Sequence, residues 1–129
     1  MKKAITGALA LLFFYACAHV QEPITNNCDV LPIPHSVELT SDRFAFDGDV
    51  ALEIVAGDED KRILNDYLEA SPLAFAGKSS KSLTLEIAAV EGITSPEGYR
   101  LESTEDNVKV TALSGAGLFY GVQTILQLL

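Results

Sequence analysis

Several short runs of the chain alternate apolar and polar side chains, a pattern typical of strands that bury one face. The alternation predicts strands over residues 36–40, 43–46, 50–55, 83–87, 99–102 and 108–112. Turn-forming residues at 47–49, 95–98 and 105–107 separate some of these runs. The last turn is short enough to join its two flanking strands into a hairpin.

A first helix is predicted to begin at Gly57-Asp58, where Asp58 can serve as its cap and acidic residues suit the positive end of the helix dipole. Apolar residues then follow at helical spacing: Ile63, Leu64, Tyr67 and Leu68. Pro72 should stop this helix.

A second helix is predicted to close the chain, with Ser114 as its N-cap. Six apolar side chains fall on one face of it: Leu118, Phe119, Val122, Ile125, Leu126 and Leu129. Strands and helices in this order indicate an α+β fold, in which both helices pack against a mostly antiparallel sheet.

The first eighteen residues differ from the rest and have the pattern of a secretory signal. Lys2 and Lys3 precede an apolar stretch from Ala4 to Tyr15, which is shorter than the roughly 20 residues of a membrane span. We therefore expect a signal peptide at 1–18, a linker at 19–29 and one folded domain at 30–129. The protein would be exported, to the periplasm or to the outer membrane or cell surface as a lipoprotein.

Two processing sites are compatible with the residues that follow the apolar stretch. Ala16 and Ala18 fit an A-x-A site for signal peptidase, whereas Ala16-Cys17 fits the end of a lipobox. In the second case Cys17 would be lipidated and would anchor the protein to a membrane. The sequence leaves both open, and neither gives Cys28 a disulfide partner within the chain.

Charge excludes one class of partner. The formal net charge is −9, and removing Lys2 and Lys3 with the signal makes the remainder more acidic still. Such a surface repels a phosphate polyanion, and the sequence holds no basic cluster to overcome that repulsion. We expect no nucleic-acid partner.

The glycine-rich start of the closing helix, from Gly115 to Gly121, invites comparison with phosphate-binding loops. Tyr120 stands where the third glycine of a dinucleotide fingerprint belongs, and the Lys-Ser/Thr pair of a P-loop is missing. Gly117 and Gly121 lie one turn apart, so we interpret them as a close contact between helix and sheet. No cofactor is expected.

No active site is predicted in this chain. Glu53, Glu86 and Glu102 occupy strand positions that face away from the aliphatic side, as solvated carboxylates do. Glycosidase chemistry needs two carboxyl groups beside the scissile bond, and no pair here has an apolar, aromatic setting. His19 and His35 lie far apart and form no zinc motif. We therefore predict no catalytic, cofactor-binding or metal-ligating residue.

Three segments resemble the small N-terminal domain of family 20 glycoside hydrolases, the β-N-acetylhexosaminidases. They are the P-x-P stretch Leu31–Leu39 with Phe44-Ala45-Phe46 after it, the strand Pro96–Leu101, and the closing helix Gly117–Gln127. They occur in the family's order and span nearly the whole chain after the linker. Related domains occur in other N-acetylglucosaminidase families, so the sugar-hydrolase association is firmer than the exact activity.

The resemblance implies a scaffold domain that packs against a catalytic (β/α) barrel. The sequence stops where that barrel begins, so we expect this chain alone to be inactive. Leu128 and Leu129 would be buried by the barrel. N-acetylhexosamine-containing glycans would be bound and hydrolysed by the barrel, in cis or in trans.

Two other functions remain open from the sequence. One is a non-catalytic carbohydrate-binding module or surface lipoprotein, which needs exposed aromatic side chains. The other is a protein-interaction domain that joins a separately encoded barrel. Most of the aromatic residues fall on core-facing positions, which disfavours the carbohydrate-binding module.

Overall fold

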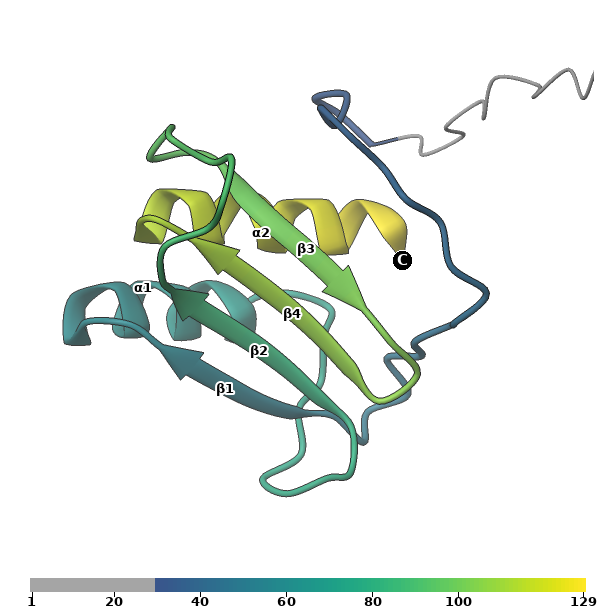
Figure 1. Cartoon of the computed structure of the whole chain (residues 1–129). Coiled ribbons are helices and arrows are strands. Elements are labelled where there is room, and N and C mark those ends of the chain that lie inside the picture. The colour runs from purple at the N-terminus through teal and green to yellow at the C-terminus, as the bar shows by residue number, and fades with distance from the viewer. Residues whose placement is uncertain (1–29) are drawn as a thin grey trace, which may run out of the picture.

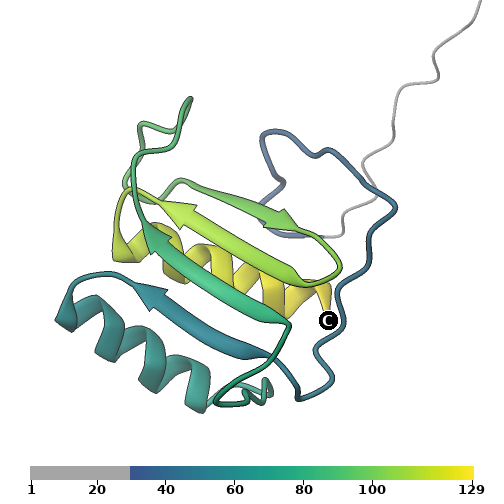
Figure 2. The ribbon, with the colours of Figure 1, turned by 60° about the horizontal axis from the view of Figure 1, so that its bottom comes forward.

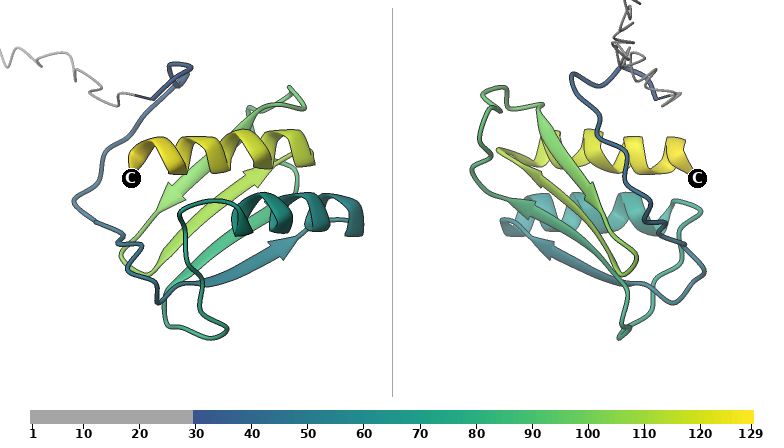
Figure 3. Two further views of the ribbon diagram at one scale, coloured as in Figure 1. Left: turned by 180° about the vertical axis from the view of Figure 1, so that it is seen from behind. Right: turned by 45° about the vertical axis from the view of Figure 1, so that its right-hand side comes forward.

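Both helices lie on the same face of a four-stranded sheet in the computed structural model, which describes residues 30–129 (Figure 1). In chain order the elements are β1 (Ala51–Val55), α1 (Asp58–Glu69), β2 (Ser82–Ile87), β3 (Tyr99–Ser103), β4 (Asn107–Ala112) and α2 (Gly115–Leu128). Figure 2 shows the two layers edge-on, and Figure 3 shows the helices in front of the sheet when the molecule is seen from behind. The predicted α+β class and the two helices are confirmed.

The sheet is mixed, so the predicted mostly antiparallel arrangement is wrong. Its strand order is β1-β2-β4-β3; the first two neighbouring pairs are parallel and only β3 and β4 are antiparallel. α1 returns the chain to the end of the sheet at which β1 begins, so β2 runs parallel to β1. β4 then folds back along β3 and inserts between β3 and β2, which makes it parallel to β2. The predicted hairpin is therefore present as the β3–β4 pair, and β4 joins it to the parallel part of the sheet.

The period-two alternation places one apolar face of the sheet under the helices. Leu83 and Leu85 of β2 pair in register with Val108 and Val110 of β4, and all four are buried. The intervening residues carry the polar side chains to the opposite face. This alternation is why the later strands could be placed from sequence.

Two predicted strands, at 36–40 and 43–46, are absent: the structure has no strand before β1 in the part of the chain it describes. Phe44 and Phe46 are half-buried and form an edge-to-face pair, with ring centroids 4.8 Å apart, against the core. Leu39 is 64% exposed. The phenylalanines thus bury their rings by packing on the core, without a ladder of backbone hydrogen bonds.

The N-cap of α1 lies one residue before the predicted cap, Asp58. Gly57 occupies the N-cap position and Asp58 is the first helical residue, so Asp58 acts through its charge near the helix N-terminus rather than as the cap. Leu64 and Leu68 are the buried residues of this helix. The helix ends at Glu69, before Pro72, as predicted.

α2 approaches the sheet closely because two of its turns present no side chain to it. A Cβ on Gly117 would lie 2.5 Å from the carbonyl oxygen of Gly98 and 2.7 Å from the Cβ of Ala112. A Cβ on Gly121 would collide with a methyl group of Val110. The interpretation of these glycines as contact residues is confirmed.

The N-cap position of α2 is Ser114, as predicted, but the hydroxyl does not cap the helix. Ser114 Oγ donates to the carbonyl oxygen of Pro96 at 2.6 Å, which fastens the start of α2 to the turn before β3. Of the six residues predicted on the apolar face, three are fully buried, two are half-buried and Leu129 is exposed. The buried three are Leu118, Val122 and Ile125.

Candidate docking surface

The face of the sheet that the helices leave uncovered is polar and charged. Glu53, Thr84, Lys109 and Glu102 stand side by side across its four strands. Lys109 Nζ lies 2.7 Å from a carboxylate oxygen of Glu86. The hydrogen bond that Lys109 donates to Glu86 raises the pKa of Lys109, and the charges of the neighbouring carboxylates act in the same direction. This face has the composition of a solvated surface.

The three strand glutamates are therefore surface carboxylates, as predicted. Glu53 and Glu102 are exposed and Glu86 is half-buried. None of them lies in the apolar enclosure that is typical of a catalytic acid. Among residues 30–129 no group of histidine, cysteine and acidic side chains is placed to hold a metal ion.

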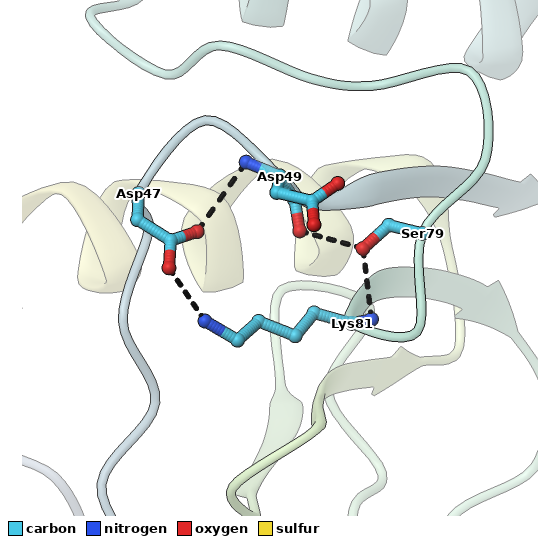
Figure 4. Close-up of polar contacts among 4 residues, drawn as sticks. All are labelled: Asp47, Asp49, Ser79 and Lys81. Atoms are coloured by element: carbon cyan, nitrogen blue, oxygen red, sulfur yellow. Dashed lines mark hydrogen bonds and ion pairs between the residues drawn. The ribbon is translucent and has the colours of Figure 1, made fainter.

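A second polar cluster fastens the loops that precede β1 and β2 (Figure 4). Lys81 Nζ lies 2.7 Å from Asp47 Oδ2, and the other oxygen of Asp47 accepts the backbone N–H of Asp49 at 3.3 Å. Ser79 Oγ donates to the carbonyl of Asp49 at 2.6 Å and accepts the N–H of Lys81 at 3.0 Å. The hydrogen bond from Lys81 holds the pKa of Asp47 below its usual value. These contacts close two turns and leave no group directed at a ligand.

Two open hollows lie on the described surface. One, of about 550 Å³, lies beside β1 and is bordered by Lys61 and Asn65 of α1. The other, of about 230 Å³, lies between the first turns of the helices, where Asp60 and Ile63 face Ala116 and Tyr120. Gly115 is in contact with the Asp60 carboxylate, so an acidic group already faces the start of α2 and opposes a phosphate there.

The side of α2 that faces away from the sheet carries no charge. Its 14 residues include no acidic or basic side chain, although charged residues make up 21% of the protein. Four neutral residues follow one another along its outer side at spacings of four, three and four, and we call them the α2 stripe: Ala116, Tyr120, Gln123 and Gln127. A solvated helix of this length usually shows charged residues on its outer side.

At the C-terminal end of this helix the exposed side chains are apolar. Leu128 is 54% exposed and Leu129 is 64% exposed. Residues 30–34, which we call the strap, reach the same end of α2, and Figures 1 and 3 show this part of the chain passing beside it. Leu31 and Ile33 of the strap are also exposed. Exposed apolar side chains that gather in one region mark interaction sites more often than solvated surface.

Leu128 and Leu129, which the resemblance singled out, thus follow directly on Gln127, which contacts the strap, a segment that the sequence analysis used only to identify the family. Neither the strap nor the α2 stripe was identified as a surface from the sequence. The one signal in the sequence was the absence of charged residues from residue 110 onward. His35 lies in the exposed segment before β1 and joins no cluster. Cys17, the candidate lipidation site, lies outside the described residues. No helix within residues 30–129 has the length and apolarity needed to cross a membrane.

Comparison with known proteins places these features in a family. Residues 27–129 match the profile described as glycosyl hydrolase family 20, domain 2. The β-hexosaminidase of Porphyromonas gingivalis is 31% identical over 151 aligned positions, which take in all of this chain and 18% of that protein. The GH20 β-N-acetylhexosaminidase from Streptomyces coelicolor A3(2) has 32% identity and a TM-score of 0.44, covering 58% of this chain and 16% of the other. The chain therefore spans less than a fifth of the length of these relatives.

Proposed function

We propose, from the premise that this chain belongs to glycosyl hydrolase family 20 through residues 27–129, that it is the N-terminal scaffold domain of an exported β-N-acetylhexosaminidase. Such an enzyme hydrolyses terminal β-linked N-acetylhexosamines. The catalytic barrel, in cis or in trans, would bind the glycan and supply the reacting groups. The domain described above would hold that barrel.

The observation that carries the proposal is the uncharged outer side of α2, which ends at the exposed Leu128 and Leu129. Fully burying a leucine side chain contributes about 1.5–3 kcal/mol, and each of these two still has more than half of its surface to bury. A barrel packed on this end of the helix would remove that surface from water. The charged, open face of the sheet would stay in solvent.

A carbohydrate-binding module is supported less well. Stacking on a sugar needs exposed aromatic rings, and within residues 30–129 Tyr120 is the one exposed aromatic side chain. Tyr67 and Phe119, by contrast, pack edge-to-face with centroids 4.8 Å apart between the two helices. The aromatic residues thus serve the core.

The test is a pair of substitutions in the natural full-length protein. Leu128→Ser with Leu129→Ser should shorten the half-life of heat inactivation, assayed on a chromogenic β-N-acetylglucosaminide, by about tenfold, because roughly 1.4 kcal/mol of docking energy is lost. The matched control is Val55→Ser, which changes an apolar side chain that is 46% exposed on β1, away from α2. If both variants lose activity at the same rate as the parent, the scaffold role is wrong.

Export and anchoring need a separate measurement. We propose that the chain is exported, and that Cys17 either is removed with the signal or carries the lipid that anchors the protein. Incorporation of labelled palmitate into the expressed protein, lost in Cys17→Ser, would support the anchor. A mature N-terminus at His19, found by mass spectrometry, would support soluble export and exclude the anchor.

A further inference from the structure

The side chain of Gln127 joins the strap to the end of α2 by two hydrogen bonds. Gln127 Oε1 accepts the backbone N–H of Leu31 at 2.8 Å, and Gln127 Nε2 donates to the carbonyl oxygen of the same residue at 2.9 Å. The amide therefore satisfies both backbone groups of Leu31, as a neighbouring strand would. Val30, just before this contact, is 2% exposed and packs inward.

This arrangement fixes the backbone of the strap while its large side chains point to solvent. Leu31 is 72% exposed and Ile33 is 83% exposed. Pro32 and Pro34 have no backbone N–H, so the strap cannot form a regular ladder of hydrogen bonds, and Gln127 pairs with both backbone groups of Leu31 instead. If the strap were only a connection, two hydrogen bonds that hold Leu31 and Ile33 exposed to water would serve no purpose.

We propose that the strap and the end of α2 form one contact surface for the catalytic barrel, joined by Gln127, with Leu31 and Ile33 contacting the barrel together with Leu128 and Leu129. This rests on the proposed function and extends it from a helix end to a surface made of two segments 96 residues apart in sequence. The barrel is the occupant because Gln127 joins the strap to the helix end that the proposed function gives to the barrel. Neither segment carries a charge, so the surface suits an apolar partner and not a charged one.

Gln127 is then a positioning residue. Removing its amide should loosen the strap without changing Leu31, Ile33, Leu128 or Leu129. The strap would have to be ordered again each time the barrel docks, at a cost in conformational entropy. The contribution of Leu31 to docking should therefore depend on Gln127.

The chain provides a matched control on the same helix. Gln123 lies one turn before Gln127 and donates its Nε2 to the hydroxyl of Tyr67 on α1, not to the strap. Gln123→Leu and Gln127→Leu each remove one glutamine amide from α2. They differ in whether the lost hydrogen bonds hold the strap.

The experiment measures amide hydrogen exchange and heat inactivation in the full-length protein. Gln127→Leu should speed exchange at the Leu31 amide by about tenfold or more, because that N–H loses its acceptor, whereas Gln123→Leu should leave it unchanged. Leu31→Ser should shorten the half-life of heat inactivation in the parent and have a smaller effect in the Gln127→Leu background. Leu31 is exposed, so this substitution leaves folding of the domain intact.

Failure of this inference differs from failure of the proposed function. If Leu31→Ser and Gln127→Leu leave the half-life unchanged while the Leu128→Ser, Leu129→Ser variant shortens it, the strap is not part of the docking surface and the scaffold role stands. Rapid exchange of the Leu31 amide in the parent would show that Gln127 does not hold the strap. If none of these variants changes the half-life, the scaffold role itself fails.

Discussion

The two helices cover one face of the same sheet, yet their outer sides differ in kind. α1 carries seven charged residues among its twelve, including an exposed Arg62–Asp66 pair with 3.2 Å between nitrogen and oxygen. α2 carries none among its fourteen. Both helices bury leucines in the common core, so the difference is not one of core packing.

The comparison separates a helix with a charged outer side from one with a neutral outer side, and the proposed function places the barrel at the end of the second. The charges on α1 keep its outer side hydrated, and its two buried residues are enough to fix it. α2 buries residues on the sheet side and leaves neutral or apolar residues outside, ending at Leu128. The inner sides of the helices should therefore respond alike to mutation, and only the outer sides should differ.

The largest expected effects test whether the two inner sides are equivalent. Leu64 of α1 is 1% exposed and Leu118 of α2 is 0% exposed. Replacing either with alanine should lower the free energy of unfolding by about 2–5 kcal/mol, because each removes a buried side chain and leaves a cavity. Urea unfolding of the two variants measures this. A loss below 1 kcal/mol for Leu64→Ala alone would show that α1 lies outside the core.

A smaller effect is expected where α2 meets the sheet. Gly117→Ala forces a methyl group against the carbonyl of Gly98, and backbone cannot yield as a flexible side chain can. We expect a loss of about 1–3 kcal/mol in the free energy of unfolding, typical of overpacking. Gly77→Ala is the control, since a Cβ there meets nothing within 4 Å. Equal stability of the two variants would mean that α2 does not depend on close contact.

The sequence predicted the elements better than their assembly. Val108 and Val110 alternate with polar residues, and this pattern predicts their burial without reference to strand pairing. The parallel pairing of β2 with β4 joins segments that are not consecutive in the chain and leaves no local mark, because it depends on which strand order best buries the shared core. The hairpin between β3 and β4 was predictable because its turn is local.

The candidate surface was predictable only in part. Leu128 and Leu129 were expected to contact a barrel because of a resemblance, and their exposure agrees with an unfilled contact. The Gln127 attachment depends on bringing residue 31 beside residue 127, which no pattern in either segment encodes. Phe44 and Phe46 misled the strand assignment for a related reason, since alternation reports burial and not hydrogen bonding.

The smallest effect concerns pH, and the comparison predicts that it arises away from α2, which has no acidic or basic residue. The Lys81 hydrogen bond holds the pKa of Asp47 below its ordinary value of 3.8. A carboxyl whose pKa is lowered by folding stabilises the protein above its unfolded pKa, and the contribution disappears as pH falls through the folded pKa. Lys81→Met should thus be less stable than the parent at pH 7, and the difference should shrink below about pH 4. Urea unfolding at both pH values measures it, and a difference that stays constant would show that Asp47 and Lys81 act only through packing.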